Sequence, residues 1–280
     1  MKIGAHVSAA GELALSLERG AAIGANCVQI FISPPQQWHR TVHSKEATDK
    51  FKSEAIRLEM GPNFIHGTYL MNLATQDPAH LERSVNWLTY GMQTAAELGV
   101  EGVIFHVGSH KGAGFETVKE QIVKSLKAVL ASSLRGDRPY LLLETAAGAG
   151  GVIGRFSELA ELLKAVNNDR LKICLDTQHT FALGYDLTTK AGVEETLKEF
   201  DETIGLDKLA AIHCNDSKVE RGSLRDRHEN IGEGLIGKDG FKYLLNHPAL
   251  ANIPFLLEVP GFAGTGPDKE NIDILKALVK

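Results

Sequence analysis

The chain alternates between short apolar runs and longer segments in which apolar residues recur every three or four positions. A short apolar run bounded by turn residues is typical of a buried strand, and the longer periodicity is typical of an amphipathic helix. The pattern predicts eight strands, at residues 2–7, 27–32, 64–66, 103–106, 141–144, 173–176, 211–213 and 255–258. It predicts a helix after each strand, at residues 12–23, 45–59, 80–98, 116–130, 156–166, 192–204, 240–246 and 269–279.

Strands that alternate with helices indicate parallel βαβ units. The length of 280 residues suits one closed α/β barrel, which typically has about 250 residues. No linker or change of composition divides the sequence. We therefore expect a single (β/α)8 TIM-barrel domain over residues 1–280.

The last six predicted strands each end at a residue of a type that binds metal ions. These residues are His66, His106, Glu144, Asp176, His213 and Glu258. The C-terminal ends of parallel strands meet at one mouth of a barrel, so we expect a polynuclear metal site there. Burying so many ionisable groups without a cation would be very costly. A mixture of imidazole and carboxylate favours zinc, manganese or iron over magnesium or calcium.

Three long connections leave the same end of the predicted barrel, at residues 33–38, 67–72 and 215–237. His179 lies just past the end of its strand, and Asp226 and His228 have the i, i+2 spacing that points two side chains the same way in an extended segment. These three residues are further candidate ligands. Long loops on a compact scaffold are usually functional or disordered.

The same loops carry candidate contacts to a nucleic acid. Trp38, Tyr69 and Leu70 suit stacking or wedging against bases, although packing on neighbouring loops is an equal alternative. Lys218 and Arg227 suit contacts to phosphates beside a metal site, although they also fit a solvated loop of mixed charge.

Composition and charge limit the partners only partly. The net charge of −5 is unusual for a protein that binds nucleic acid. Three divalent ions would bring it to about +1 and place positive charge at the mouth. No apolar run of about 18 residues and no signal peptide is visible, so we expect no membrane partner and a cytoplasmic location. Residues 232–237 match GxGxxG but follow no strand directly, so we expect no nucleotide cofactor.

Several motifs together resemble those of the endonuclease IV family of zinc-dependent apurinic/apyrimidinic endonucleases, along the whole chain. They are Gly4–Gly11, His106–His110, Glu144–Ala146, Asp176–Ala182, His213–Lys218 and Asp226–His228 with Gly232–Gly234. The resemblance implies three Zn²⁺ ions, with Mn²⁺ or Fe²⁺ as possible substitutes. It assigns His66, His106 and Glu144 to the first ion, and Glu144, Asp176, His213 and Glu258 to the second. His179, Asp226 and His228 would hold the third.

The resemblance also implies an activity, a substrate and residue roles. The activity is hydrolysis of the phosphodiester 5′ to an abasic site by a trinuclear zinc mechanism, leaving a 3′-hydroxyl and a 5′-deoxyribose phosphate. The partner is double-stranded DNA with abasic or 3′-blocked lesions, bound by a monomer at the nucleoid. Glu144 and Glu258 would be the catalytic residues. Gln36, Tyr69 and Leu70 would enter the duplex, although Gln36 stands where some members have arginine.

Two other functions fit the same barrel. A sugar isomerase or epimerase would use one or two metal ions, more carboxylates and a base near a sugar carbon. The histidine-rich set and the additional Asp226 and His228 argue against it. A protein that binds damaged DNA without cutting it is the other alternative, and only a measurement of turnover separates it from an endonuclease.

Overall fold

The structure is a computed structural model that describes residues 1–132 and 136–280. Within these residues, eight parallel strands close into a barrel in the order β1-β10-β7-β6-β5-β4-β3-β2. The barrel strands are β1 (Ile3–His6), β2 (Val28–Ile30), β3 (Phe64–His66), β4 (Gly102–Phe105), β5 (Tyr140–Glu144), β6 (Leu171–Asp176), β7 (Leu209–His213) and β10 (Phe255–Leu257). The predicted (β/α)8 barrel is therefore confirmed. Each predicted strand is present, with its ends moved by no more than two residues.

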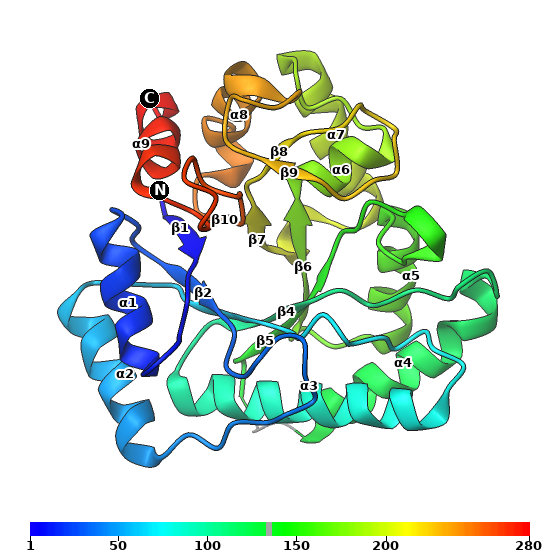
Figure 1. Cartoon of the computed structure of the whole chain (residues 1–280). Helices are drawn as coiled ribbons and strands as arrows, with labels where there is room; N and C mark the ends of the chain where they lie inside the picture. The colour runs from blue at the N-terminus through cyan, green and yellow to red at the C-terminus, as the bar shows by residue number, and fades with distance from the viewer. Residues whose placement is uncertain (133–135) are drawn as a thin grey trace.

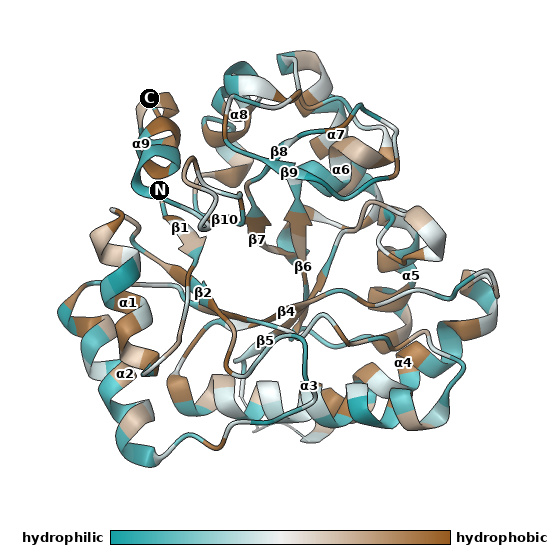
Figure 2. Cartoon of the chain, viewed as in Figure 1, coloured by the Kyte–Doolittle hydropathy of each residue, from teal (hydrophilic) through white to brown (hydrophobic). Residues whose placement is uncertain are grey.

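Helices surround the barrel between successive strands (Figure 1). They are α1 (Leu13–Ala22), α2 (Lys45–Arg57), α3 (Pro78–Leu98), α4 (Phe115–Ser132), α5 (Phe156–Val166), α7 (Lys190–Thr203), α8 (Gly237–Leu245) and α9 (Lys269–Leu278). These are the eight helices that the periodicity predicts. Figure 2 shows that they carry both hydrophobic and hydrophilic bands, as expected for helices with one face on the strands. No helix among the described residues is apolar over a length that would span a membrane.

Some elements inside the connections were not predicted. A short helix, α6 (Thr177–Leu183), follows β6 directly, and the hairpin of β8 (Asp216–Ser217) and β9 (His228–Glu229) lies in the long connection after β7. The described residues also contain three 3₁₀ turns, η1 (Ala149–Gly151), η2 (Leu206–Lys208) and η3 (Pro248–Leu250). The long connection predicted at residues 215–237 therefore contains a two-stranded antiparallel sheet, which pairs its beginning with residues 228–229.

The interior of the barrel is filled by a cluster of buried side chains that is separate from the larger core between strands and helices. Its members are Cys27, Phe64, Ile104, Leu142, Cys174, Ala211 and Leu256. Side chains two apart on a strand point to the same face. We call this cluster the interior plug. Six of its residues each lie two positions before a candidate ligand at a strand end. Those ligands therefore point along the barrel axis, above the plug. This alternation places the candidate ligands at the C-terminal mouth.

Candidate metal centre

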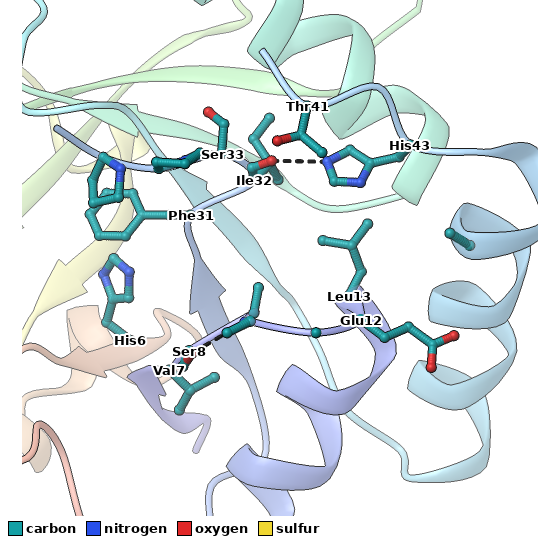
Figure 3. A pocket seen from close by; sticks show the side chains of 16 residues that line it. His6, Val7, Ser8, Glu12, Leu13, Phe31, Ile32, Ser33, Thr41 and His43 are labelled. Carbon is teal, nitrogen blue, oxygen red and sulfur yellow. Dashed lines mark hydrogen bonds between the residues drawn. The ribbon is translucent and has the colours of Figure 1, made fainter. Parts of the chain in front are cut away.

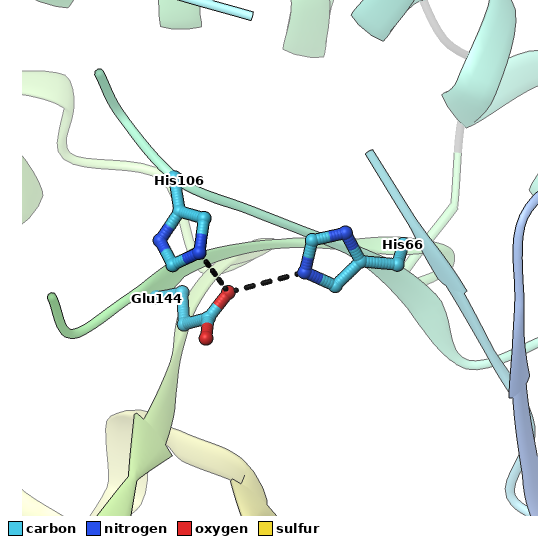
Figure 4. A group of neighbouring side chains, drawn as sticks. All are labelled: His66, His106 and Glu144. Carbon is cyan, nitrogen blue, oxygen red and sulfur yellow. Dashed lines mark hydrogen bonds and ion pairs between the residues drawn. The ribbon is translucent and has the colours of Figure 1, made fainter. Parts of the chain in front are cut away.

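The first group of candidate ligands consists of His66, His106 and Glu144 (Figure 4). His66 ends β3 and Glu144 ends β5, while His106 follows the last residue of β4. One carboxylate oxygen of Glu144, Oε2, lies 3.2 Å from Nε2 of His66 and 3.5 Å from Nε2 of His106. Three ligand atoms from neighbouring strands thus converge on one point.

The second group lies on the other side of the Glu144 carboxylate and includes Asp176, His213 and Glu258. Oε1 of Glu144 is 2.9 Å from Nδ1 of His213, and Oε2 of Glu258 is 3.3 Å from the same nitrogen. Glu144, Asp176 and His213 are completely buried. Glu144 therefore faces two groups with its two oxygens, as a bridging ligand requires.

The third group joins the barrel to the long connection after β7. Asp176, His179 and His228 have ligand atoms close together, and Asp226 approaches both histidines. Its Oδ2 is 3.3 Å from Nε2 of His179, and its Oδ1 is 3.4 Å from Nε2 of His228. Asp226 has a side chain that is 57% exposed, so this group lies at the outer rim.

The three groups share members, which makes them one cluster. Glu144 belongs to the first and second groups, and Asp176 to the second and third. All nine residues that the sequence singled out as ligands lie in this cluster, at the mouth of the barrel. A cavity of about 380 Å³ opens above it, with Phe31, Tyr69 and Pro267 among its other lining residues.

The electrostatics of the cluster favour ionised carboxylates. Burial alone would raise the pKa of Glu144, but His106 and His213 foremost lower it well below its usual range. Burial likewise opposes the charge of His179, yet Asp176 and Asp226 raise its pKa to about 10. The pKa of Asp226 falls to about 2 because His179 and His228 outweigh the desolvation of its partly exposed carboxylate. Glu144 and Asp226 are thus held ionised, the form in which a carboxylate binds cations.

The donor set and one orphaned atom fit bound metal ions. Nε2 of His228 is buried without a hydrogen-bond partner in the described residues, although carboxylate oxygens of Asp226 and Asp176 lie 3.4 and 3.7 Å away. A buried polar atom rarely lacks a partner. A cation held jointly by the imidazole and the two carboxylates would satisfy all three groups, and a mixed set of this kind suits zinc.

Asp176 also organises the chain locally. It is the N-cap of α6, where its Oδ1 accepts a hydrogen bond of 2.8 Å from the backbone N–H of His179. Its Oδ2 accepts a bond of 2.7 Å from the side chain of Asn215. The same Asn215 accepts a bond from the backbone N–H of Glu258 with its own oxygen. One carboxylate thus sets the position of His179 and, through Asn215, of Glu258.

The connection after β7 is anchored by Asp216, which is buried. The Asp216 carboxylate accepts hydrogen bonds from five backbone N–H groups, those of Ser217, Gly232, Gly234, Ile236 and Gly237. The Gly-rich stretch 232–237 therefore wraps an internal carboxylate, which explains its resemblance to an anion-binding loop without any nucleotide. Together with the β8–β9 hairpin, these hydrogen bonds hold Asp226 and His228 at the mouth of the barrel.

The residues predicted to contact DNA lie on three connections, those after β2, β3 and β7. Tyr69 is 62% exposed, with its ring edge-on to Phe31 at a centroid distance of 5.3 Å, and Leu70 beside it is half-buried. Gln36 is exposed on the β2–α2 connection. Lys218 and Arg227 are exposed on the loop after β7, where Lys218 lies 3.8 Å from Glu229. All five side chains are accessible or partly accessible.

Trp38 differs from the expectation of an exposed stacking residue. Its ring is half-buried, packs edge-on against His80 at a centroid distance of 5.3 Å, and lies under the guanidinium of Arg83. It follows the alternative of packing on neighbouring segments.

Sequence reasoning missed two residues beside the ligands, His6 and Gln29. His6 ends β1, and its Nδ1 lies 3.1 Å from Oε1 of Glu258. Gln29 lies in the middle of β2 and contacts Glu258 and His213. The available signal was a glutamine within an otherwise apolar strand, because a buried amide needs partners.

The comparisons with known proteins agree with this geometry. Residues 17–278 match the family described as xylose isomerase-like TIM barrel, and the chain belongs to it. The chain is 40% identical over 278 residues to the "Probable endonuclease 4" of Halothermothrix orenii, which covers 99% of each protein. It is 39% identical to the "Probable endonuclease 4" of Haloquadratum walsbyi over 95% of this chain and 94% of the relative. Within the barrel family, the chain is a member of the endonuclease IV family.

Solved structures give the same assignment. The crystal structure of endonuclease IV from Thermus thermophilus superposes with a TM-score of 0.88 at 32% identity, covering 99% of this chain and 98% of that one. A D-tagatose 3-epimerase-like protein superposes with a TM-score of 0.70 at 20% identity, covering 99% and 97%. The second similarity shows a shared fold and nothing further.

Proposed function

We propose that the protein is a zinc-dependent DNA repair endonuclease that hydrolyses the phosphodiester on the 5′ side of an abasic site. The single observation that carries this proposal is the cluster of nine ligand-type residues in three groups linked by Glu144 and Asp176. Sugar-converting enzymes on this barrel would need one or two metal ions. Relatives of this chain over almost its whole length carry the name endonuclease 4.

The nine residues would divide among three Zn²⁺ ions. His66, His106 and Glu144 would hold the first, and Glu144, Asp176, His213 and Glu258 the second. His179, Asp226 and His228 would hold the third, with Asp176 in contact. Bound zinc would supply Lewis acidity, which lowers the pKa of water toward ~7 and stabilises the charge that develops on the phosphate oxygens.

The protein itself would orient the reacting groups. Glu144, fixed between His66 and His213, would hold the attacking water in line with the bond from phosphorus to the 3′-oxygen, and Glu258 would assist. Water adds to phosphorus, that bond breaks, and the proton passes to the 3′-oxygen. The products are a 3′-hydroxyl and a 5′-deoxyribose phosphate.

Lesion selectivity would come from the low cost of extruding a nucleotide without a base. An abasic sugar has no base to unstack, so it can leave the helix for the cavity above the metal cluster at little cost. The exposed Tyr69 and its neighbour Leu70 lie on the connection after β3, and Gln36 lies on the connection after β2. These three side chains would occupy the resulting gap in the duplex. Lys218 and Arg227 would contact the phosphate backbone.

A direct test compares three substrates with the zinc-loaded protein. They are a duplex with one abasic analogue, the same duplex without it, and a ketohexose as substrate for a sugar epimerase. The proposal predicts cleavage of the first duplex alone. Conversion of the sugar without cleavage would replace it with the epimerase function, and tight binding of the lesion without cleavage would leave a damage-binding protein.

A further inference from the structure

Two of the eight barrel strands, β1 and β2, end without any of the nine candidate ligands, yet each sends a polar side chain into the cluster. Gln29 on β2 has no exposed surface. Its Oε1 lies 2.8 Å from Nε2 of His213, and its Nε2 donates to Oε1 of Glu258. One amide thus contacts two ligands of the same proposed ion.

Each of these contacts fixes one feature of a ligand. The amide oxygen of Gln29 can only accept, so Nε2 of His213 donates to it, and Nδ1 is the nitrogen that would bind a cation. That Nδ1 faces Glu144 and Glu258, at 2.9 and 3.3 Å. The amide nitrogen engages Oε1 of Glu258 and leaves Oε2, the oxygen nearer His213, for a cation.

His6 completes this arrangement from β1. Its Nδ1 is 3.1 Å from Oε1 of Glu258 and 2.9 Å from the amide nitrogen of Gln29. Its ring packs against Phe31 at a centroid distance of 4.3 Å, which holds the imidazole in place. Figure 3 shows His6 and Phe31 together beside the neighbouring cavity of about 630 Å³. The two residues line both this cavity and the one above the metal cluster.

We propose that Gln29, supported by His6, is a positioning residue that orients His213 and Glu258 for one metal ion. The inference rests on the metal centre of the proposed function. Residues that hydrogen-bond metal ligands fix the tautomer and orientation of those ligands, and their loss typically weakens metal affinity or activity by roughly 10- to 100-fold. Strands β1 and β2, which carry no candidate ligand, therefore complete the site by orienting ligands that other strands carry.

The test uses two variants with complementary defects and one matched control. Gln29→Met keeps the length of the side chain and removes both hydrogen bonds, whereas Gln29→Asn keeps the amide but shortens its reach. Asn63→Leu is the control, because Asn63 is also a buried amide bonded to β2, through the backbone N–H of Val28 at 2.9 Å. Asn63 precedes β3, at the opposite end of the barrel from the ligands.

The readouts are zinc affinity, measured by competition with a chromogenic chelator, and melting temperature. Both Gln29 variants should bind at least one zinc ion roughly 10- to 100-fold more weakly than the parent chain, and added zinc should restore incision. Asn63→Leu should lower the melting temperature and leave zinc affinity unchanged. If a folded Gln29 variant binds zinc with an affinity within twofold of that of the parent chain, the inference is overturned and the proposed function is not. A parent chain that binds no zinc would overturn the proposed function as well.

Discussion

Glu144 and His213 meet at the floor of the barrel mouth, where Oε1 of the carboxylate lies 2.9 Å from Nδ1 of the imidazole. The other oxygen of Glu144 turns to His66, 3.2 Å away. The first and second groups of ligands are therefore joined through one side chain, and both depend on the presence of its carboxylate.

The variant Glu144→Ala should abolish incision and leave the barrel folded. The change removes the shared carboxylate, so the loss of activity should be at least roughly 100-fold, comparable to the removal of a strong electrostatic contact to the transition state. Circular dichroism should show unchanged helix content, because the interior plug beneath Glu144 is untouched. Incision by this variant at a rate near that of the parent chain would refute the role of Glu144.

Removal of metal should destabilise the protein. Chelation leaves buried histidines and carboxylates without the cation that they share. A ligand present at 100 times its Kd stabilises the folded state by about 2.7 kcal/mol. For a chain of this size, the melting temperature after dialysis against a chelator should fall by ~5 °C or more, and zinc should restore it. Identical melting curves before and after chelation would show that the cluster holds no metal.

The variant Tyr69→Ala should weaken binding to the lesion without loss of zinc. Its exposed ring lines the cavity above the metal cluster but offers no ligand atom to any of the three groups. Base–aromatic stacking contributes about 1–3 kcal/mol, so Kd for an abasic duplex should rise roughly 5- to 150-fold. Ile56→Ala is the control, since Ile56 is 79% exposed on α2, outside the cavity. Equal affinity of Tyr69→Ala and the parent would exclude Tyr69 from the interface.

Lys218→Ala and Arg227→Ala should each reduce the salt dependence of DNA binding. Removing a cation that neutralises one phosphate makes the slope of log K against log salt shallower by about 1. Affinity for damaged and undamaged duplexes should fall by the same factor, because interactions with the DNA backbone carry no lesion information. Lys198, exposed on α7, provides a charge-matched control. Unchanged slopes in both variants would show that these cations do not bind phosphates.

The variant Asp216→Ala should loosen the connection after β7. Five backbone N–H groups would lose their common acceptor, and a hydrogen bond to a charged group contributes about 1.5–3 kcal/mol. We therefore expect limited proteolysis to cut within residues 216–237, and zinc content to fall because Asp226 and His228 belong to this segment. Protease resistance equal to that of the parent would contradict an anchoring role.

The sequence predicted the barrel and the position of the cluster for one physical reason. A buried strand ends where its apolar run ends, and in a closed parallel sheet those ends meet. His66, Glu144, Asp176 and His213 are therefore visible as final residues of strands. His106 and Glu258 each lie one residue beyond the end of a strand. Their side chains still point along the barrel axis, as those of the other four ligands do.

The features that were missed depend on contacts between distant segments or on very short elements. Gln29 and His213 are far apart in sequence, and no local periodicity reports a hydrogen bond across the barrel. Helix α6 has seven residues and is buried on nearly all sides, so it lacks an amphipathic pattern. For Trp38 the sequence left exposure and packing as equal alternatives, because the contacts with His80 and Arg83 arise only in the folded chain.

The chemistry is tested most directly with a duplex that carries one tetrahydrofuran abasic analogue, the zinc-loaded protein and product identification by mass. The analogue cannot undergo β-elimination, so only hydrolysis can cut the strand beside it. We predict one incision on the 5′ side of the analogue, with a 3′-hydroxyl on one fragment and a 5′-phosphate on the other. An uncut strand, or fragments with other ends, would contradict the proposed endonuclease.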